Sequence, residues 1–512
     1  IIKMKKFSFL SMAFAALLLS ATTACSSDDN NDGGDKGGDT RNWSTDGGLK
    51  AADDLLFDGT TIGNGDAQFV FKGKQTLKKG TYTLKGWVYI ADGSELTIEP
   101  GTIIKGDKAT KSAIIVERGG KIWAKGTQSE PIVFTSGEAA GKRKPGDWGG
   151  IILCGKAKHN GNEAQIEGGP RSFHGGQDNA DNSGALSYVR IEFAGYPFKD
   201  NQEINGLTMG SVGSGTQIDH IQVSYCNDDS FEWFGGTVNC NHLISYKAWD
   251  DDFDTDNGFS GKVQFCLAVR DPRIADTSKS NGFESDNNSS GSTAEPYTNA
   301  VFSNVTFIGP IASDANFQNT SDYINAGDYR PNNTSALGQF QSAMQIRRNS
   351  HLCCFNSIAV GFPIGLILDN QRGNTQQAAT DGLVKLQNIW FADMDVLGSD
   401  ANGQYKDLFV SGYDADEKPI YAADESRESF SSTFFKTAAF NNKVVTKEEM
   451  GLTDPAGIGV AYCGGTALTG KASFSDALVS SGFQTVNYIG AVNTSDNWLS
   501  GWTEFNPQAK TY

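Results

Sequence analysis

Short stretches in which apolar and polar residues alternate recur through the middle of the chain. One set comprises residues 188–191, 220–223, 266–269, 304–307, 357–360 and 388–391. A second set lies between them, at residues 207–209, 231–233, 253–255, 283–285, 344–346 and 366–368. Alternation with a period of two is typical of β-strands with one buried face. Two sets of strands that take turns along the chain predict a coil that passes the same two faces repeatedly.

The spacing between equivalent residues is nearly constant. His220 and His242 are 22 residues apart, and so are Phe231 and Phe253. A repeat of about 22–24 residues with short strands is the size of one coil in a parallel β-helix. We therefore predict an all-β fold, a right-handed parallel β-helix, because strand crossovers of this kind are right-handed.

The regular spacing is interrupted by insertions and fades towards the end of the chain. Long loop insertions fall mostly at residues 271–281, 287–300 and 309–342. We predict an N-terminal cap, the β-helix and a C-terminal capping region at residues 49–79, 80–395 and 396–512. The last region should cover the end coil or pack along the side, because an uncovered end exposes strand edges and apolar core.

The first residues have the pattern of a secretory signal. A basic start at residues 4–6 precedes an apolar run at residues 7–19, which is too short to span a membrane. We predict a signal peptide over residues 1–24, with Cys25 as the lipid-bearing first residue of the mature chain. An ordinary secretory signal with the same cleavage point is the alternative. Residues 25–48 are rich in Asp, Asn, Gly and Ser, and predict a flexible acidic linker.

The charge of the chain restricts its partners. The formal net charge is −17, and removal of the signal peptide, which carries three lysines, makes it more negative. This argues against nucleic acid and anionic lipid head groups, which are bound through basic patches. No second apolar stretch is long enough for a transmembrane helix. Besides Cys25 there are seven cysteines, an odd number without zinc-like spacing, which we interpret mostly as small buried residues.

The second set of stretches carries an acid at the same position in three successive coils. These acids are Glu232, Asp254 and Glu284, and each lies between larger or apolar neighbours. We therefore expect all three to point out of the helix on one face. Asp252 and Asp256 alternate with Asp254 along a single strand and are expected to share that face.

Stacked carboxylates repel one another, so such a face is well solvated, holds a cation or has raised pKa values. More acids occupy the turns just before these strands, at Asp228, Asp229, Asp250 and Asp251. Three interpretations stay open: a solvated acidic face, a Ca²⁺ site, or a carboxylate pair that cuts glycosides. The candidate metal ligands are Asp252, Asp254, Asp256, Glu232 and Glu284.

Aromatic residues lie close to the acids in the sequence. Flat rings can hold sugar rings, so Trp233 and Trp249 are candidate ligand-binding residues, together with Asp286 and Arg347. The alternatives are that the rings fill the core and that Arg347 balances the acids or is a plain surface charge. No catalytic residue is assigned, because the five histidines form no Ser-His-Asp grouping. No phosphate-binding loop or dinucleotide fingerprint is present.

Three segments carry a resemblance to a known family. The turn at residues 99–102, the strand at residues 147–151 and the tail at residues 498–507 resemble Bacteroidetes surface β-helix lipoproteins. The similarity covers nearly all of residues 80–512. It implies a β-helix, a lipid anchor in the outer membrane and a position facing the cell exterior. It carries over no catalytic residue.

These observations favour a non-enzymatic, lipid-anchored surface protein that binds a glycan, a nutrient or a surface partner. The resemblance adds the expectation that it works beside an outer-membrane transporter. The first alternative is a polysaccharide lyase or glycoside hydrolase that uses the acidic face. The second is a purely structural surface protein.

Overall fold

The computed structural model describes residues 39–161, 164–166, 171–199, 202–324, 327 and 338–512. The chain divides into two units, residues 1–39 and 40–512, and the fold described below is that of the second. Cys25 and the expected signal peptide lie outside the described residues. Among the described helices, none is long and apolar enough to cross a membrane.

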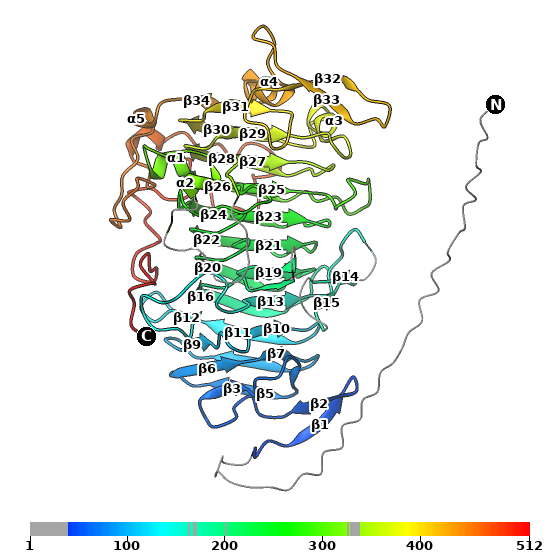
Figure 1. Ribbon diagram of the computed structural model, residues 1–512, viewed down its shortest axis with the longest axis vertical. Helices are drawn as coiled ribbons and strands as arrows, with labels where there is room; N and C mark the ends of the chain where they lie inside the picture. Colours follow the sequence, from blue (N-terminus) through cyan, green and yellow to red (C-terminus); the bar gives the residue numbers. More distant parts are fainter. Residues whose placement is uncertain (1–38, 162–163, 167–170, 200–201, 325–326, 328–337) are drawn as a thin grey trace, which may run out of the picture. The chain divides into compact units, whose positions relative to one another are not determined.

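The fold consists of two large sheets whose strands alternate along the chain and stack coil upon coil (Figure 1). The first sheet contains, in spatial order, β1 (Trp43–Asp46), β2 (Leu49–Ala52), β4 (Phe69–Phe71), β7 (Trp87–Ile90), β10 (Ala113–Val116), β13 (Ile151–Cys154), β19 (Leu207–Gly210), β21 (Phe231–Phe234), β23 (Phe253–Asp256), β25 (Phe283–Ser285), β27 (Ser342–Ile346), β29 (Ile364–Leu368) and β31 (Val396–Ser399). All of its neighbours pair in parallel except β1 and β2. This is the predicted right-handed parallel β-helix.

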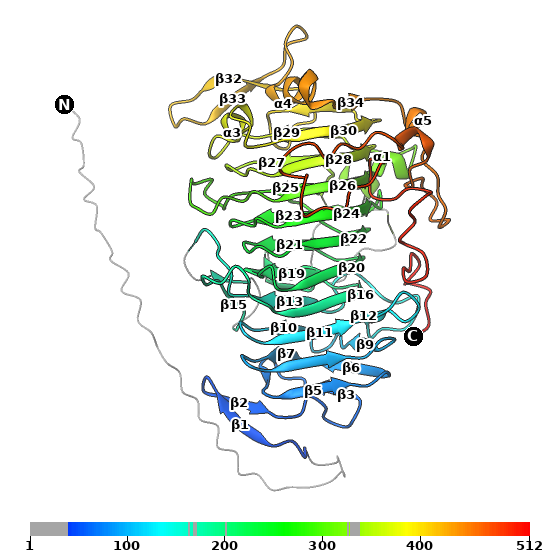
Figure 2. The same cartoon turned by 180° about the vertical axis from the view of Figure 1, so that it is seen from behind.

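The second sheet runs along the opposite side of the coil (Figure 2). Its main path contains β3 (Thr61–Gly63), β6 (Thr81–Lys85), β9 (Ile103–Gly106), β12 (Ile132–Ser136), β16 (Gly184–Glu192), β20 (Gln217–Ser224), β22 (Cys240–Tyr246), β24 (Lys262–Val269), β26 (Val301–Ile308), β28 (Cys353–Val360), β30 (Leu386–Ala392) and β34 (Lys443–Val444). Three further strands join it, β5 (Lys74–Leu77), β8 (Glu95–Ile98) and β11 (Lys121–Lys125).

The remaining elements lie in loops and at the end of the coil. The hairpins are β14 (Ala164–Gln165) with β15 (Phe173–His174), β17 (Pro197–Lys199) with β18 (Gln202–Glu203), and β32 (Phe409–Tyr413) with β33 (Pro419–Ala422). The short helices are α1 (Pro310–Ser313), α2 (Ser321–Ile324), α3 (Thr375–Thr380), α4 (Phe430–Phe435) and α5 (Lys447–Met450).

The coil begins earlier than the sequence suggested. Residues 49–79, which we expected to form a cap, already contribute β2 to β5 to the two sheets. β1 lies in the segment expected to be a linker and pairs with β2. At the other end, α4 covers the last coil and brings Phe435 onto Phe391, with ring centroids 4.3 Å apart.

Each long strand of the second sheet, from β16 to β30, contains one residue in the left-handed backbone region. These residues align in neighbouring coils and have φ between 50° and 60°: Tyr188, His220, His242, Phe265, Asn304, Asn356 and Asn388. The repeated stretches at residues 266–269 and 357–360 predicted Cys266 and Ser357 in this row. Cys266 in fact pairs with Leu243 and Ser357 with Ile389, so both are one residue out of register.

The residues 471–512, here called the C-terminal arm, run back along the second sheet. Asn356 donates to the Ser473 carbonyl at 2.9 Å, and much further down the coil Lys105 donates to the Tyr512 carbonyl at 2.9 Å. Trp498 and Trp502 cover the row of left-handed residues, with Trp498 4.9 Å from the His242 ring. The arm therefore ties together coils that are distant in sequence.

Candidate functional site

The acids of the first sheet form the row that the alternating pattern predicted. Glu232 in β21 pairs in register with Asp254 in β23, which pairs with Glu284 in β25. Thr208 and Gln345 extend the row on either side. Their neighbours along each strand, such as Phe231 and Phe253, are fully buried in the core. Because neighbouring strands lie about 4.8 Å apart, the row places like charges close together on the outside of the coil.

A turn residue completes a compact group within this row. Asp229 immediately precedes β21, and one carboxylate oxygen from each of Asp229, Glu232 and Asp254 lies within 4.8 Å of the other two. We call these three residues the acid trio. Asp229 also belongs to a second group with Asp228 and Asp250. The sequence placed Asp229 in the turn, but only the folded coil shows that this turn bends back over the row.

The electrostatics of the acid trio are unfavourable for three negative charges. Burial raises the pKa of Asp229, and the charges of Asp228, Asp251, Asp254 and Glu232 raise it further. The pKa of Asp254 is raised in the same way, first by burial and then by neighbouring carboxylates.

The Oδ1 atom of Asp254 is buried and has no hydrogen-bond partner in the described part of the chain. The Asn205 amide donates to Glu232. The trio therefore either retains protons or binds a cation.

The far end of the row is neutralised by arginines. Arg347 donates to Asp286 at 2.8 Å and also to Glu284, and Arg348 donates to Asp286 at 2.5 Å. The Glu284 and Asp286 charges raise the pKa of Arg347 although its burial opposes this. Of the predicted metal ligands, Glu284 is thus engaged in an ion pair. Asp286 and Arg347, predicted to bind a ligand, are engaged with each other.

Asp256 lies on the same outer face, two residues after Asp254 in β23. Burial and the nearby charge of Asp286 raise its pKa to about 8. The backbone N–H of Asn257 donates to its Oδ1 at 2.6 Å. Asp256 is therefore another carboxyl that keeps its proton near neutral pH.

Asp252 does not share this face, contrary to our expectation. It is fully buried, its carboxylate lies 3.1 Å from the Nε atom of Arg270, and Ser245 donates to it at 2.5 Å. The reason is that β23 begins only at Phe253, so the alternation does not extend back to Asp252. Burial raises its pKa to about 6, and the residue cannot join the outer acids in holding an ion.

The two predicted aromatic ligand contacts are core residues. Trp233 is fully buried and stacks on Phe259, with centroids 5.2 Å apart. Trp249 is also fully buried, and its indole N–H donates to Asp276 at 3.2 Å. Neither ring faces solvent, so the interpretation of these rings as core packing holds and their assignment to a ligand site is wrong.

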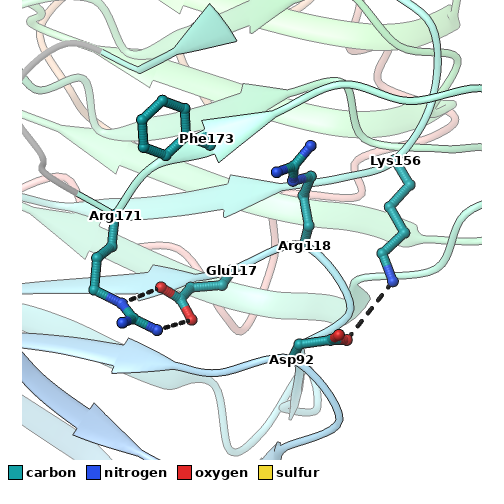
Figure 3. Close-up of a pocket in the computed structure, with 6 residues that line it drawn as sticks. All are labelled: Asp92, Glu117, Arg118, Lys156, Arg171 and Phe173. Atoms are coloured by element: carbon teal, nitrogen blue, oxygen red, sulfur yellow. Dashed lines mark hydrogen bonds and ion pairs between the residues drawn. The ribbon is translucent and has the colours of Figure 1, made fainter. Parts of the chain in front are cut away.

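A separate cavity of about 490 Å³ lies at the ends of β7, β10 and β13 (Figure 3). Its charged lining is largely paired within the protein. Arg171 makes two hydrogen bonds to Glu117, at 2.5 and 2.8 Å, and one to Asp46 at 2.7 Å. Lys156 points towards Asp92 at 3.6 Å. The pairing around Arg171 fastens the excursion that carries β14 and β15 to the N-terminal coils.

Comparison with protein families gives a match over most of the chain. A family model described as a pectate-lyase-like beta helix domain matches residues 70–429 of the chain. No curated protein and no solved structure was found to match the chain. The matched region contains the whole acid row and most of the coil.

Proposed function

The chain belongs to the family of pectate-lyase-like β-helix domains, and from that premise we propose that it is a surface protein that binds a carbohydrate through a calcium ion on the acid trio. The observation that carries the proposal is the grouping of Asp229, Glu232 and Asp254, whose carboxylate oxygens lie within 4.8 Å of one another. Ca²⁺ takes six to eight oxygen ligands, with carboxylates as the usual protein donors. Three carboxylates leave coordination positions open, and sugar hydroxyl groups are suitable neutral oxygen ligands for them.

The calcium ion also accounts for the electrostatics of the trio. An ion with two positive charges offsets the repulsion that raises the pKa values of Asp229 and Asp254. It also gives a partner to the buried Oδ1 atom of Asp254. A ligand that supplies hydroxyl groups rather than further carboxylates suits the strongly acidic chain, which has a formal net charge of −17.

The placement at the cell surface is part of the same proposal. Its support is the signal-like segment followed by Cys25 and an acidic, Gly- and Ser-rich stretch. Lipid attached to Cys25 would hold the β-helix at the outer membrane. Metabolic labelling with a palmitate analogue, compared between the natural chain and Cys25→Ala, tests this part by itself.

Glycoside hydrolysis is the second candidate, and one feature of the trio favours it. Asp254, with its raised pKa, would hold a proton beside Glu232, which is the arrangement of a general acid and a carboxylate nucleophile. Carboxyl groups about 5–5.5 Å apart are typical of retaining glycosidases. We favour binding because the group has three carboxylates with oxygens within 4.8 Å of one another, which suits a calcium ion better than the two carboxyl groups that a glycosidase uses.

A glycan array probed with the purified protein, in calcium and in EDTA, tests the proposed function. We expect glycan binding that requires calcium and is lost in Glu232→Gln and Asp254→Asn. Glu138→Gln, at an exposed position away from the acid trio, serves as the control and should bind normally. A reducing-sugar assay on the glycans that bind separates the candidates. Release of reducing ends would replace the binding proposal with glycoside hydrolysis. Failure to find any glycan whose binding requires calcium would contradict the metal site.

A further inference from the structure

A second cavity lies at the C-terminal end of the coil, away from the acid trio. Its volume is about 540 Å³, and it is lined by Asn370, Gln371, Gly373, Asn374, Tyr413 and Glu417. Tyr413 and Glu417 come from the hairpin of β32 and β33, and the others from the loop between β29 and α3. Figures 1 and 2 show this hairpin beside α3 at the same end of the stack. The volume falls within the range of about 300–1,000 Å³ that is common for small-molecule sites.

The lining combines an exposed aromatic ring with amide groups. Tyr413 is 57% exposed, which places it among the large hydrophobic residues at the surface. An aromatic ring in water gains when an apolar face covers it, and the C–H face of a sugar ring is such a face. The only charged residue among the six that line the cavity is Glu417.

The amide groups are held in place and still have hydrogen bonds to give. The Asn374 carbonyl oxygen accepts from Gln377 at the start of α3, and the Asn374 backbone N–H donates to Asn349 at 2.6 Å. Asn370 donates to Asn374 at 3.1 Å. Within the described residues, the side-chain amide of Gln371 and the Nδ2 group of Asn374 make no hydrogen bond. Fixed amides with unused donors and acceptors are well suited to bind hydroxyl groups.

The backbone at Glu417 supports a specific role for this side chain. Glu417 has φ of 61°, in the left-handed region that Gly or Asn normally occupies in a hairpin turn. A residue with a Cβ atom is disfavoured in that conformation. The turn nonetheless carries a glutamate that lines the cavity, where its carboxylate can accept hydrogen bonds from hydroxyl groups and repels anionic ligands.

We propose that this cavity binds a neutral oligosaccharide, with one sugar ring stacked on Tyr413 and its hydroxyl groups hydrogen-bonded to Gln371, Asn374 and Glu417. The site is separate from the acid trio and needs no cation. It therefore goes beyond the proposed function and does not rest on it. On a surface protein, two sugar sites at different heights of one rigid coil would grip a polysaccharide at two points and strengthen its attachment.

Isothermal titration calorimetry in EDTA tests the proposal, with the purified protein and cellohexaose, maltohexaose, xylohexaose and mannohexaose as probes. At least one probe should bind. Tyr413→Ala should weaken that binding by about tenfold or more, whereas Tyr413→Phe, which keeps the ring, should change it by less than about threefold. Ile420→Ala, at an exposed position of the same hairpin, is the matched control and should bind normally.

Three results would overturn the proposal. They are failure of all four probes to bind the natural protein, unchanged affinity in Tyr413→Ala, and equal loss in Ile420→Ala, which would indicate damage to the hairpin. The acid-trio variant Glu232→Gln should retain this binding, so a failure of the calcium site and a failure of the Tyr413 cavity give different results. Circular dichroism of each variant verifies that the hairpin substitutions leave the coil folded.

Discussion

Asp252 and Asp254 lie two residues apart and illustrate how position decides the chemistry of a carboxylate. Asp252 points into the coil, where it forms an ion pair with Arg270 and accepts a hydrogen bond from Ser245. Asp254 points outwards into a row of acids, and one of its oxygens is left without a partner among the described residues. The first is therefore a structural ion pair, and the second is available to bind a cation.

Loss of Arg270 should leave the Asp252 charge buried and uncompensated. We expect Arg270→Met to lower the free energy of unfolding by about 3–5 kcal/mol. The double variant Asp252→Leu/Arg270→Met should be more stable than Arg270→Met alone, because it removes the charge as well. Urea denaturation measures both. Lys436→Met, which breaks an exposed ion pair with Glu428, is the control. It should lower the free energy of unfolding by at most about 1 kcal/mol.

Asp256 should make the stability of the metal-free protein depend on pH. Its pKa is about 8 in the folded protein, whereas an unfolded chain has an aspartate pKa of about 4. Between these two pH values the folded state binds a proton that the unfolded state has released, so the free energy of unfolding falls as the pH rises and levels off above the folded pKa.

The variant Asp256→Asn removes this dependence and keeps the acceptor for the Asn257 N–H. In EDTA it should be more stable than the natural protein above about pH 8 and equally stable near about pH 3, where Asp256 is largely neutral in both states. Thermal unfolding at the two pH values measures the difference. A variant that is less stable at both would contradict the raised pKa.

At the scale of elements, the left-handed row sets the path of every long strand in the second sheet. Asn356 occupies this row with φ of 52° and also binds the C-terminal arm, accepting from the Ser473 N–H at 2.8 Å. Its amide donates to Ser473 in return. One residue thus fixes both the bend of β28 and the position of the arm.

Substitutions at Asn356 separate these two roles. Asn356→Gly loses the hydrogen bonds but keeps the backbone conformation, whereas Asn356→Ala also strains the backbone. The Ala variant should be less stable than the Gly variant by about 1 kcal/mol. At Ser357, which has ordinary strand geometry, the order should reverse, because Gly in a strand is less stable than Ala by about 0.5–1 kcal/mol. Chemical denaturation measures the stability of each variant. If Ala and Gly rank in the same order at both positions, the left-handed conformation of Asn356 is contradicted.

The sequence predicted the strands of the first sheet in correct register, because Phe231, Phe253 and Phe283 mark the inward position without interruption. In the second sheet a bend residue inserts into the alternation, and Phe265 looks like a core residue although it is part of that bend. The register there was consequently wrong by one at Cys266.

The candidate site was predictable only in part, for a similar reason. The outward position of Glu232, Asp254 and Glu284 followed from alternation along their strands. The participation of Asp229 depends on the path of a turn, and the pairing of Glu284 with Arg347 joins residues 63 positions apart. Local patterns contain neither kind of information.

At the scale of the whole β-helix, the C-terminal arm acts as a brace along the stack. Gln222 and Glu504 exchange two hydrogen bonds, at 2.7 and 2.9 Å, and Arg143 donates to the Pro507 carbonyl at 2.6 Å. Coils of a solenoid contact only their neighbours. A segment that binds many coils therefore makes their unfolding more cooperative than neighbour contacts alone would.

Removal of the Trp502 side chain should release this brace. Trp502 is 1% exposed and packs edge-on against Tyr188 and His220, both at 5.7 Å. We expect Trp502→Ala to lower the free energy of unfolding by about 3–5 kcal/mol. The arm should also become sensitive to limited proteolysis. Trp43→Ala, at a position that is 36% exposed, is the control and should leave the cleavage pattern unchanged. An intact arm in Trp502→Ala would contradict its role as a brace.

The central claim is that Asp229, Glu232 and Asp254 hold a calcium ion on the outer face of the first sheet. The most direct measurement is anomalous X-ray diffraction from crystals of the protein soaked in terbium, a calcium substitute with strong anomalous scattering. We expect an anomalous peak between the three carboxylates, and its loss in crystals of Asp254→Asn. Absence of a peak at the acid trio, with terbium bound elsewhere or not at all, would contradict it.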